Sequence, residues 1–226
     1  MNIRTALTRT GTAALLGTAM LVGAPAAQAV PILSEVFDIT SDHCSGGCAP
    51  AGTIFGTVSL IQDGTSVDFT VHLNSGFAYA KTGSADDQSF KFNGVGITAS
   101  DITITSPTTP ALVASAGSFN GDGTGPFGFA IGCPSCGGGL SPPTFSSDIV
   151  FTVADATIAD LTVPNVPNGN VFVVDIGNLS TGATGPVDAT IPRDIVFPPN
   201  LVPEPGSLAL LGLALAGVGF SRRRRQ

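Results

Sequence analysis

The sequence predicts an all-β protein whose central domain is an antiparallel β-sandwich. Three observations support this fold class. First, 29 of the 226 residues are glycine and 17 are proline, and both residue types weaken long helices. Second, 43% of the residues are hydrophobic, which argues against a disordered chain. Third, the central part of the chain alternates short apolar segments with Gly, Pro, Asn and Asp clusters, without a sustained helical period.

Residues 67–74 have the clearest strand pattern. Polar residues alternate there with an apolar set formed by Val67, Phe69, Val71 and Leu73. The preceding segment also alternates, with Ile54, Val58 and Leu60 in one set and Phe55, Thr57 and Ser59 in the other. Residues 62–65 join the two segments, and the Asp-Gly pair within them is typical of a hairpin turn. We therefore predict a β-hairpin here.

Further strands are predicted along the rest of the domain. They lie at residues 89–93, 101–105, 127–131, 149–153 and 171–176. Seven to nine short strands separated by turns indicate an antiparallel sandwich, and a jelly roll or a β-barrel is the alternative. Residues 178–194 show little apolar pattern, so they either end the domain or begin a stalk.

The charges are distributed unevenly along the chain. Between residues 30 and 201, fifteen acidic residues stand against three basic ones, which leaves a formal charge of −12. Such an acidic domain repels the phosphates of nucleic acids, so we expect no nucleic-acid partner. The same negative charge is compatible with binding of divalent cations but does not require it.

The first 29 residues have the three parts of a secretory signal peptide. Arg4 and Arg9 give a positive start, and residues 11–23 are mostly apolar. Small residues follow at Ala27 and Ala29, where a signal peptidase requires them, so we predict cleavage after Ala29. The alternative is an uncleaved membrane helix, but the apolar run is short for a span.

The last 25 residues predict a membrane anchor. Residues 197–201 form a proline-containing linker, and a transmembrane helix is predicted at residues 207–221. Its uncharged run of 13 residues would be about 20 Å long as a helix, which is short for a hydrocarbon core of about 30 Å. The basic cluster of Arg222, Arg223, Arg224 and Arg225 would stay cytoplasmic and leave the domain outside.

The tail also resembles a known signal. Pro203, Glu204 and Pro205, followed by a short apolar span and the arginine cluster, are similar to the PEP-CTERM sorting signal. The resemblance implies recognition by an exosortase, a membrane cysteine protease-transpeptidase of Gram-negative bacteria that make exopolysaccharide. It also implies a single-pass anchored protein that later reaches the cell surface or the medium. It assigns no activity to the domain, and an ordinary C-terminal anchor is the alternative.

The four cysteines form two close pairs, Cys44 with Cys48 and Cys133 with Cys136. An even number of cysteines in an exported protein favours disulfides. Local bridges are the simplest pairing, and two crossed pairings are also possible. A zinc site and a thiol-disulfide enzyme are weaker alternatives, because the first pair is spaced by three residues and the second precedes glycines rather than a helix.

Two further clusters admit a metal but favour none. Asp42, His43 and Cys44 are adjacent in a glycine-rich loop and could share an ion. Residues 120–124 resemble half of a calcium loop, but they offer at most three oxygen ligands, so a β-turn is the better interpretation.

No catalytic set is evident in the sequence. His72 lies on the polar face of its strand, which favours a solvated side chain, and the chain has no Gly-x-Ser-x-Gly motif. Asp86 and Asp87 are adjacent in a strand, so they point to opposite faces and form a poor glycosidase pair. The chain has no Trp and only Tyr79, which leaves little for sugar stacking.

We therefore expect a signal peptide at 1–29, a secreted β domain at 30–196 and a sorting signal at 202–226. We expect no enzyme, catalytic residue, metal or cofactor. The expected function is that of an exported, envelope-tethered or surface-released domain with a structural or exopolysaccharide-matrix role. A polysaccharide- or calcium-binding module is the alternative, and an extracellular hydrolase is a third. The expected partners are exosortase, signal peptidase, the membrane and exopolysaccharide.

Overall fold

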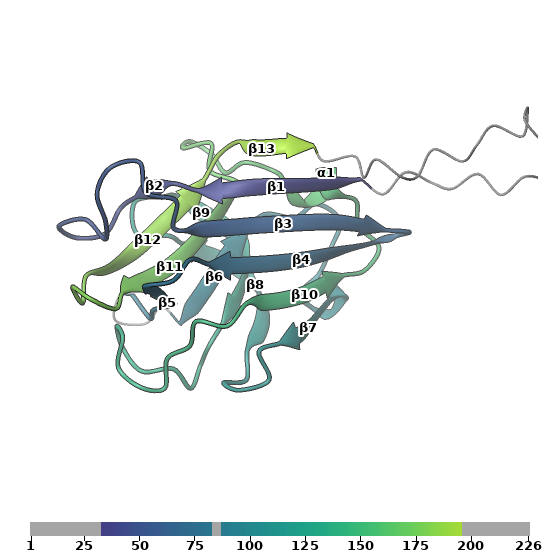
Figure 1. Ribbon diagram of the computed structural model, residues 1–226. Helices are drawn as coiled ribbons and strands as arrows, with labels where there is room; N and C mark the ends of the chain where they lie inside the picture. Colours follow the sequence, from purple (N-terminus) through teal and green to yellow (C-terminus); the bar gives the residue numbers. More distant parts are fainter. Residues whose placement is uncertain (1–32, 83–86, 196–226) are drawn as a thin grey trace, which may run out of the picture. The chain divides into compact units, whose positions relative to one another are not determined.

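The strands are arranged in two stacked antiparallel sheets, and those of the second sheet run obliquely behind those of the first (Figure 1). The computed structural model describes residues 33–82 and 87–195. The signal peptide, the linker, the transmembrane helix and the sorting residues therefore lie outside the described residues.

The first sheet has the strand order β13-β1-β3-β4-β10-β7. Its strands are β1 (Ser34–Ile39), β3 (Gly56–Asp63), β4 (Ser66–Leu73), β7 (Ile102–Ser106), β10 (Ile149–Val153) and β13 (Pro192–Ile195). The second sheet has the order β2-β12-β11-β6-β9-β8, and β5 also pairs with β11. Its strands are β2 (Ser41–Asp42), β5 (Phe77–Tyr79), β6 (Gln88–Phe92), β8 (Val113–Asn120), β9 (Pro126–Gly132), β11 (Phe172–Asn178) and β12 (Thr184–Ala189).

Helical structure in the described residues is confined to two short elements. These are η1 (Ala99–Asp101) and α1 (Ile158–Leu161). Across 33–82 and 87–195, no helix combines the length and the apolar character needed to cross a membrane. The prediction of an all-β antiparallel domain is confirmed. Because the two sheets are separate in their hydrogen bonding, the structure favours the sandwich over a closed barrel.

The predicted hairpin is present as β3 and β4. Asp63 pairs with Ser66 at its tip, and Gly64 has a φ of 58°, a conformation that glycine adopts readily. The expected alternation holds along β4, but it fails at the start of β3. Phe55 is buried and Ile54 is 41% exposed, because the strand begins only at Gly56.

Phenylalanine rings fill the space between the sheets. Phe69 of β4 stacks on Phe151 of β10 with ring centroids 4.5 Å apart. From the second sheet, Phe90, Phe92 and Phe172 contact the same ring at 5.6 to 6.3 Å. All five rings are fully buried. Aromatic contact between the two sheets therefore defines the centre of the core, in a chain with 14 Phe and no Trp.

The structure contains more strands than predicted. The five further predicted segments overlap β6, β7, β9, β10 and β11, but the described residues hold thirteen strands rather than seven to nine. Of the two interpretations of residues 178–194, the structure supports the end of the domain and not a stalk. They include β12, whose Val187 and Ala189 are buried against β11.

Candidate functional site

A polar pocket of about 370 Å³ lies beside the end of the second sheet. Strand β2 pairs with β12 and thereby places Ser41 opposite Asp188. The loop before β11 contributes Asn168 and Asn170, and His43 follows β2 directly. The lining is completed by two threonines, Thr40 and Thr190. The pocket is thus rich in hydroxyl, amide and carboxylate groups.

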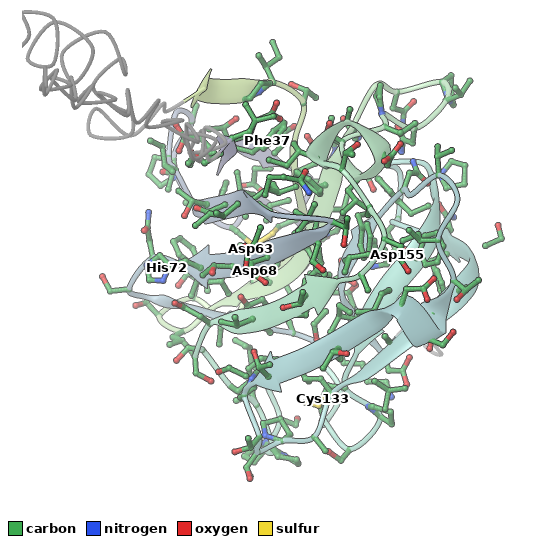
Figure 2. All side chains as sticks on the ribbon, turned by 90° about the vertical axis from the view of Figure 1, so that its right-hand side faces the viewer. Phe37, Asp63, Asp68, His72, Cys133 and Asp155 are labelled. Atoms are coloured by element: carbon green, nitrogen blue, oxygen red, sulfur yellow. A yellow bond between two sulfur atoms is a disulfide. The ribbon has the colours of Figure 1, made fainter. Side chains whose placement is uncertain are left out.

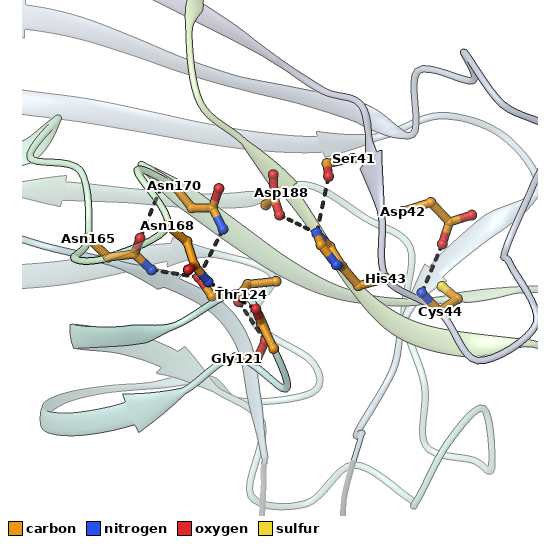
Figure 3. Close-up of polar contacts among 11 residues, drawn as sticks. Ser41, Asp42, His43, Cys44, Gly121, Thr124, Asn165, Asn168, Asn170 and Asp188 are labelled. Atoms are coloured by element: carbon orange, nitrogen blue, oxygen red, sulfur yellow. Dashed lines mark hydrogen bonds and ion pairs between the residues drawn. The ribbon is translucent and has the colours of Figure 1, made fainter.

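Ser41, His43 and Asp188 contain the residue types of a hydrolytic triad, but their geometry differs (Figure 3). The Nε2 of His43 lies 2.7 Å from Oδ2 of Asp188 and 3.1 Å from Oγ of Ser41. A working triad places the serine and the carboxylate on opposite ring nitrogens. When the Nε2 proton is donated to Asp188, the same nitrogen has no lone pair to accept the proton of Ser41. The histidine therefore cannot act as the general base for this serine.

Asp188 is 2% exposed, and this burial raises the pKa of its carboxyl group. The charge of His43 and the hydrogen bonds from His43 and Ser41 act in the opposite direction. Burial is the larger effect, because a carboxylate loses its hydration inside the protein. The pocket thus contains a carboxyl group whose charged form is disfavoured.

Asp42 does not join His43 in a metal site. Its carboxylate accepts hydrogen bonds from the backbone N–H groups of Cys44, Cys48 and Ala49 at 2.9, 2.8 and 3.2 Å. These bonds close the loop that also contains the Cys44–Cys48 disulfide. The sulfurs lie near the Asp42 carboxylate, but in a disulfide they are not thiolates and do not bind metal as such. His43 faces Asp188 instead (Figure 3).

The second cysteine pair forms the Cys133–Cys136 disulfide in the loop after β9 (Figure 2). The backbone N–H of Cys133 donates to the carbonyl of Asp87 at 2.7 Å, which holds the loop to the start of β6. Both bridges are the local ones, so the crossed pairings are absent. No helix follows Cys136, because Gly138 and Gly139 form β-bridges with Lys81.

The turn between β8 and β9 is held by asparagines rather than arranged around an ion. The carbonyl of Thr124 accepts hydrogen bonds from Nδ2 of Asn165 at 2.7 Å and from Nδ2 of Asn170 at 2.9 Å. Asn168 donates to the carbonyl of Gly123 at 3.0 Å. These backbone oxygens would be calcium ligands in a binding loop, but here they accept protein hydrogen bonds (Figure 3). The geometry supports the β-turn interpretation.

The asparagine side chains were not identified as site residues in the sequence. Asn165 and Asn170 lie 41 and 46 residues beyond Thr124. A repeated Asn in a Pro- and Gly-containing segment was the available signal, because such side chains often bond to backbone groups. It does not reveal which distant carbonyl they reach.

The other sequence candidates lie apart from the pocket. His72 is half exposed on β4, and its Nδ1 lies 2.7 Å from Oδ1 of Asp148 (Figure 2). Tyr79 is buried, stacks on Phe145 and donates its hydroxyl to the carbonyl of Val71 at 2.8 Å. Burial raises the pKa of Tyr79 well above its usual value. This ring is therefore not a surface for sugar stacking. Asp86 lies outside the described residues.

A buried ion pair was missed by the sequence analysis. Nζ of Lys91 lies 2.6 Å from Oδ2 of Asp175, and their side chains are 0% and 1% exposed. Lys91 stands between two phenylalanines, and Asp175 stands within the apolar run 171–176. A single charge inside an apolar strand indicates a buried partner, because burying an unpaired charge is very unfavourable.

The comparisons with known proteins concern the tail. The model of the PEP-CTERM protein-sorting motif matches residues 201–225, a segment that contains Pro203, Glu204, Pro205 and the arginine cluster. The chain matches no curated protein and no solved structure at a significant level. The motif implies export, exosortase-dependent sorting, and association with the membrane or the cell surface. The chain thus carries a PEP-CTERM protein-sorting motif at residues 201–225.

Proposed function

We propose that the domain at residues 30–196 is a non-enzymatic structural module of the extracellular matrix. In this proposal the signal peptide directs export, and exosortase processing leaves the domain at the cell surface or releases it. The exported location that the motif implies supports this role.

The observation that carries the proposal is the use of polar side chains for bonds within the protein. Asp42 holds the first disulfide loop, the asparagines hold the turn after β8, and Asp188 shares Nε2 of His43 with Ser41. Groups that are already engaged in this way are poorly placed to activate a substrate, because catalysis needs a base with an available lone pair. The same bonds make the loops rigid, which suits a structural module.

The polar pocket supports a second candidate function, binding of a polysaccharide. Thr40, Ser41 and Thr190 offer hydroxyls, and Asn168 and Asn170 offer amides. Sugar hydroxyls pair well with such groups. No Phe, Tyr or Trp side chain is among the lining residues, so binding here would depend on hydrogen bonds rather than on stacking.

The processed protein purified from producing cells tests both candidates. We would assay it against nitrophenyl esters and glycosides, and measure its retention on immobilised alginate and dextran. The structural role predicts no turnover above that of the His43→Ala variant. Turnover that this variant abolishes would contradict the non-enzymatic proposal.

A matched pair of variants tests the pocket. Thr190→Ala removes an exposed hydroxyl from the pocket, and Thr103→Ala removes an exposed hydroxyl from β7 in the other sheet. Retention on either polysaccharide that falls only in Thr190→Ala would favour the binding module. Equal retention of both variants and of the unmodified protein would count against the pocket as the binding site.

A further inference from the structure

Lys91 and Asp175 meet on the outer face of the second sheet. The neighbours of Lys91 on β6 are Phe90 and Phe92, whose rings contact the first sheet, so the lysine side chain leaves from the opposite face. Asp175 lies on β11, two residues beyond Val173, which is the register partner of Lys91. This diagonal position across adjacent strands lies within reach of a lysine side chain.

The protein covers this pair although it lies on the outer face. Neither side chain is more than 1% exposed. The loop after β9 packs against this part of the outer face. Gly177 lies two residues beyond Asp175 on β11 and therefore on the same face. Leu140 of the loop is so close to it that a Cβ on Gly177 would lie 2.6 Å from the leucine side chain. Bulk water is therefore kept away from the Lys91 amine and the Asp175 carboxyl group.

Stability alone explains such a pair poorly. Removing two charges from water is unfavourable, and a buried ion pair often stabilises a protein no more than apolar residues of the same size. In a dry surrounding, however, an amine and a carboxyl group held in contact can also react. The lysine amine is a nucleophile for carbonyl carbon, and Oδ2 of Asp175 is bonded directly to such a carbon.

We propose that Lys91 and Asp175 join in an intramolecular amide bond. Nζ of Lys91 forms the new bond to Cγ of Asp175, and the bond from Cγ to one carboxyl oxygen breaks. One proton first passes from the ammonium group to the Asp175 carboxylate, which frees the nitrogen lone pair for the attack. A second proton then goes to the same leaving oxygen, which departs as water, and the third stays on the amide nitrogen. The step is a condensation, so it needs no oxidant, reductant or further reactant.

The surroundings favour this condensation. The carbonyl oxygen of Gln88 accepts a hydrogen bond from Nζ of Lys91 at 3.4 Å, which helps to fix the direction of the amine. Holding two reacting groups in contact can equal an effective concentration of about 10⁵–10⁸ M. Exclusion of water also disfavours the reverse reaction, which is hydrolysis.

The bond would serve the structural role proposed above, but its test does not depend on that role. It would join two neighbouring strands of the second sheet and close a chain segment from residue 91 to residue 175. The two disulfides close segments with separations of only 4 and 3 residues. Cross-links that close longer segments restrict the unfolded chain more strongly, and an amide also resists reduction.

Tryptic mapping of the reduced and denatured protein tests the proposal. Lys81, Lys91 and Arg193 are the basic residues between positions 30 and 201. An amide at Lys91 prevents cleavage there, so we expect one fragment spanning 82–193 that is lighter by one water. Cleavage after Lys81 is the internal control. Separate fragments 82–91 and 92–193 of full mass would overturn the proposal.

Two variants show whether the water is lost at Asp175 or at another aspartate. Asp175→Ala should restore both the cleavage after Lys91 and the full mass. Asp122→Gly removes the acidic residue of the Asp122-Gly123 pair, which could lose water by cyclising, and glycine suits the φ of 37° at that position. The loss of water should persist in this variant. A loss that persists in Asp175→Ala, or disappears in Asp122→Gly, would overturn the proposal.

Discussion

Asp188 lies almost completely buried on β12, with its Oδ2 only 2.7 Å from Nε2 of the partly exposed His43. The two residues are 145 positions apart in the sequence, and the pairing of β2 with β12 brings them together. Because burial raises the pKa of Asp188 and outweighs the opposing effect of His43, the buried carboxyl group gives the domain a pH-dependent stability.

The sign of that dependence follows from proton linkage. The folded state binds the Asp188 proton more tightly than the unfolded state, in which an Asp has a pKa of about 3.9. The favourable contribution of Asp188 is therefore fully present below about pH 3.9 and is lost as the pH rises through its raised folded pKa. Urea unfolding measures the free energy of unfolding of the unmodified protein and of Asp188→Asn. The value for the unmodified protein minus the value for the variant should decrease as the pH rises.

Since His43 contacts the Asp188 carboxyl group directly, the urea measurement should be repeated with His43→Gln in both proteins. The decrease should remain in that background. A difference that instead grows with pH would contradict the assignment to the buried carboxyl group.

The buried hydroxyl of Tyr79 predicts a distinct alkaline behaviour. Its raised pKa means that the folded protein holds the phenol neutral above about pH 10, where a solvent-exposed tyrosine ionises. The contribution of Tyr79 is thus fully present below about pH 10 and is lost above it, as the unfolded state ionises first. Because Tyr79 is the only tyrosine, tyrosinate absorbance should appear together with unfolding. Tyrosinate absorbance in protein that is still folded near pH 10 would contradict this.

Asn165, Asn168 and Asn170 hold the turn between β8 and β9 by hydrogen bonds to its backbone. Removing these bonds should lower the stability of the domain, and calcium should not affect that stability. Asn165→Ala removes a buried donor to Thr124 and should lower the free energy of unfolding by about 1–3 kcal/mol. Asn168→Ala removes an exposed donor from the same region and should cost less. Thermal unfolding of the unmodified protein should not change on addition of calcium. A concentration-dependent rise in Tm would instead indicate a calcium site.

The aromatic core predicts a strong effect at its centre. Phe69→Ala leaves a cavity among four other rings and should lower the free energy of unfolding by about 3–5 kcal/mol. Val95→Ala, at a position that is 59% exposed, should change it by about 0.5 kcal/mol or less. If urea unfolding showed that Phe69→Ala and Val95→Ala lower the free energy of unfolding by similar amounts, the placement of Phe69 at the centre of the core would be contradicted.

The sequence allowed the hairpin to be predicted, because Asp63-Gly64 and the alternation in 67–74 are local signals. The β8 strand escaped detection, since all of its residues are exposed or only partly buried and its sequence lacks a clear apolar face. The start of β3 was misplaced because Phe55 packs on Phe77, a contact outside the strand. Local patterns do not encode where a strand begins when a residue of another strand, here Phe77 of β5, buries the ring that precedes it.

The site was less predictable than the fold. Its contacts join residues that are far apart in the chain, as in His43 with Asp188, Asn165 with Thr124 and Lys91 with Asp175. Residue type alone placed Asp42 and His43 together as possible metal ligands, but the backbone turns them to different partners. Which partner a polar side chain finds depends on sheet topology, and sequence spacing does not supply it.

The most direct test of the central claim is peptide sequencing of both ends of the native protein from the membrane and medium fractions. Export followed by exosortase processing predicts a protein that begins at Val30 and lacks Arg222, Arg223, Arg224 and Arg225. Replacing Pro203, Glu204 and Pro205 with alanine should leave the new N-terminus unchanged and retain the tail. A native protein that keeps its arginine cluster in both fractions would contradict the account.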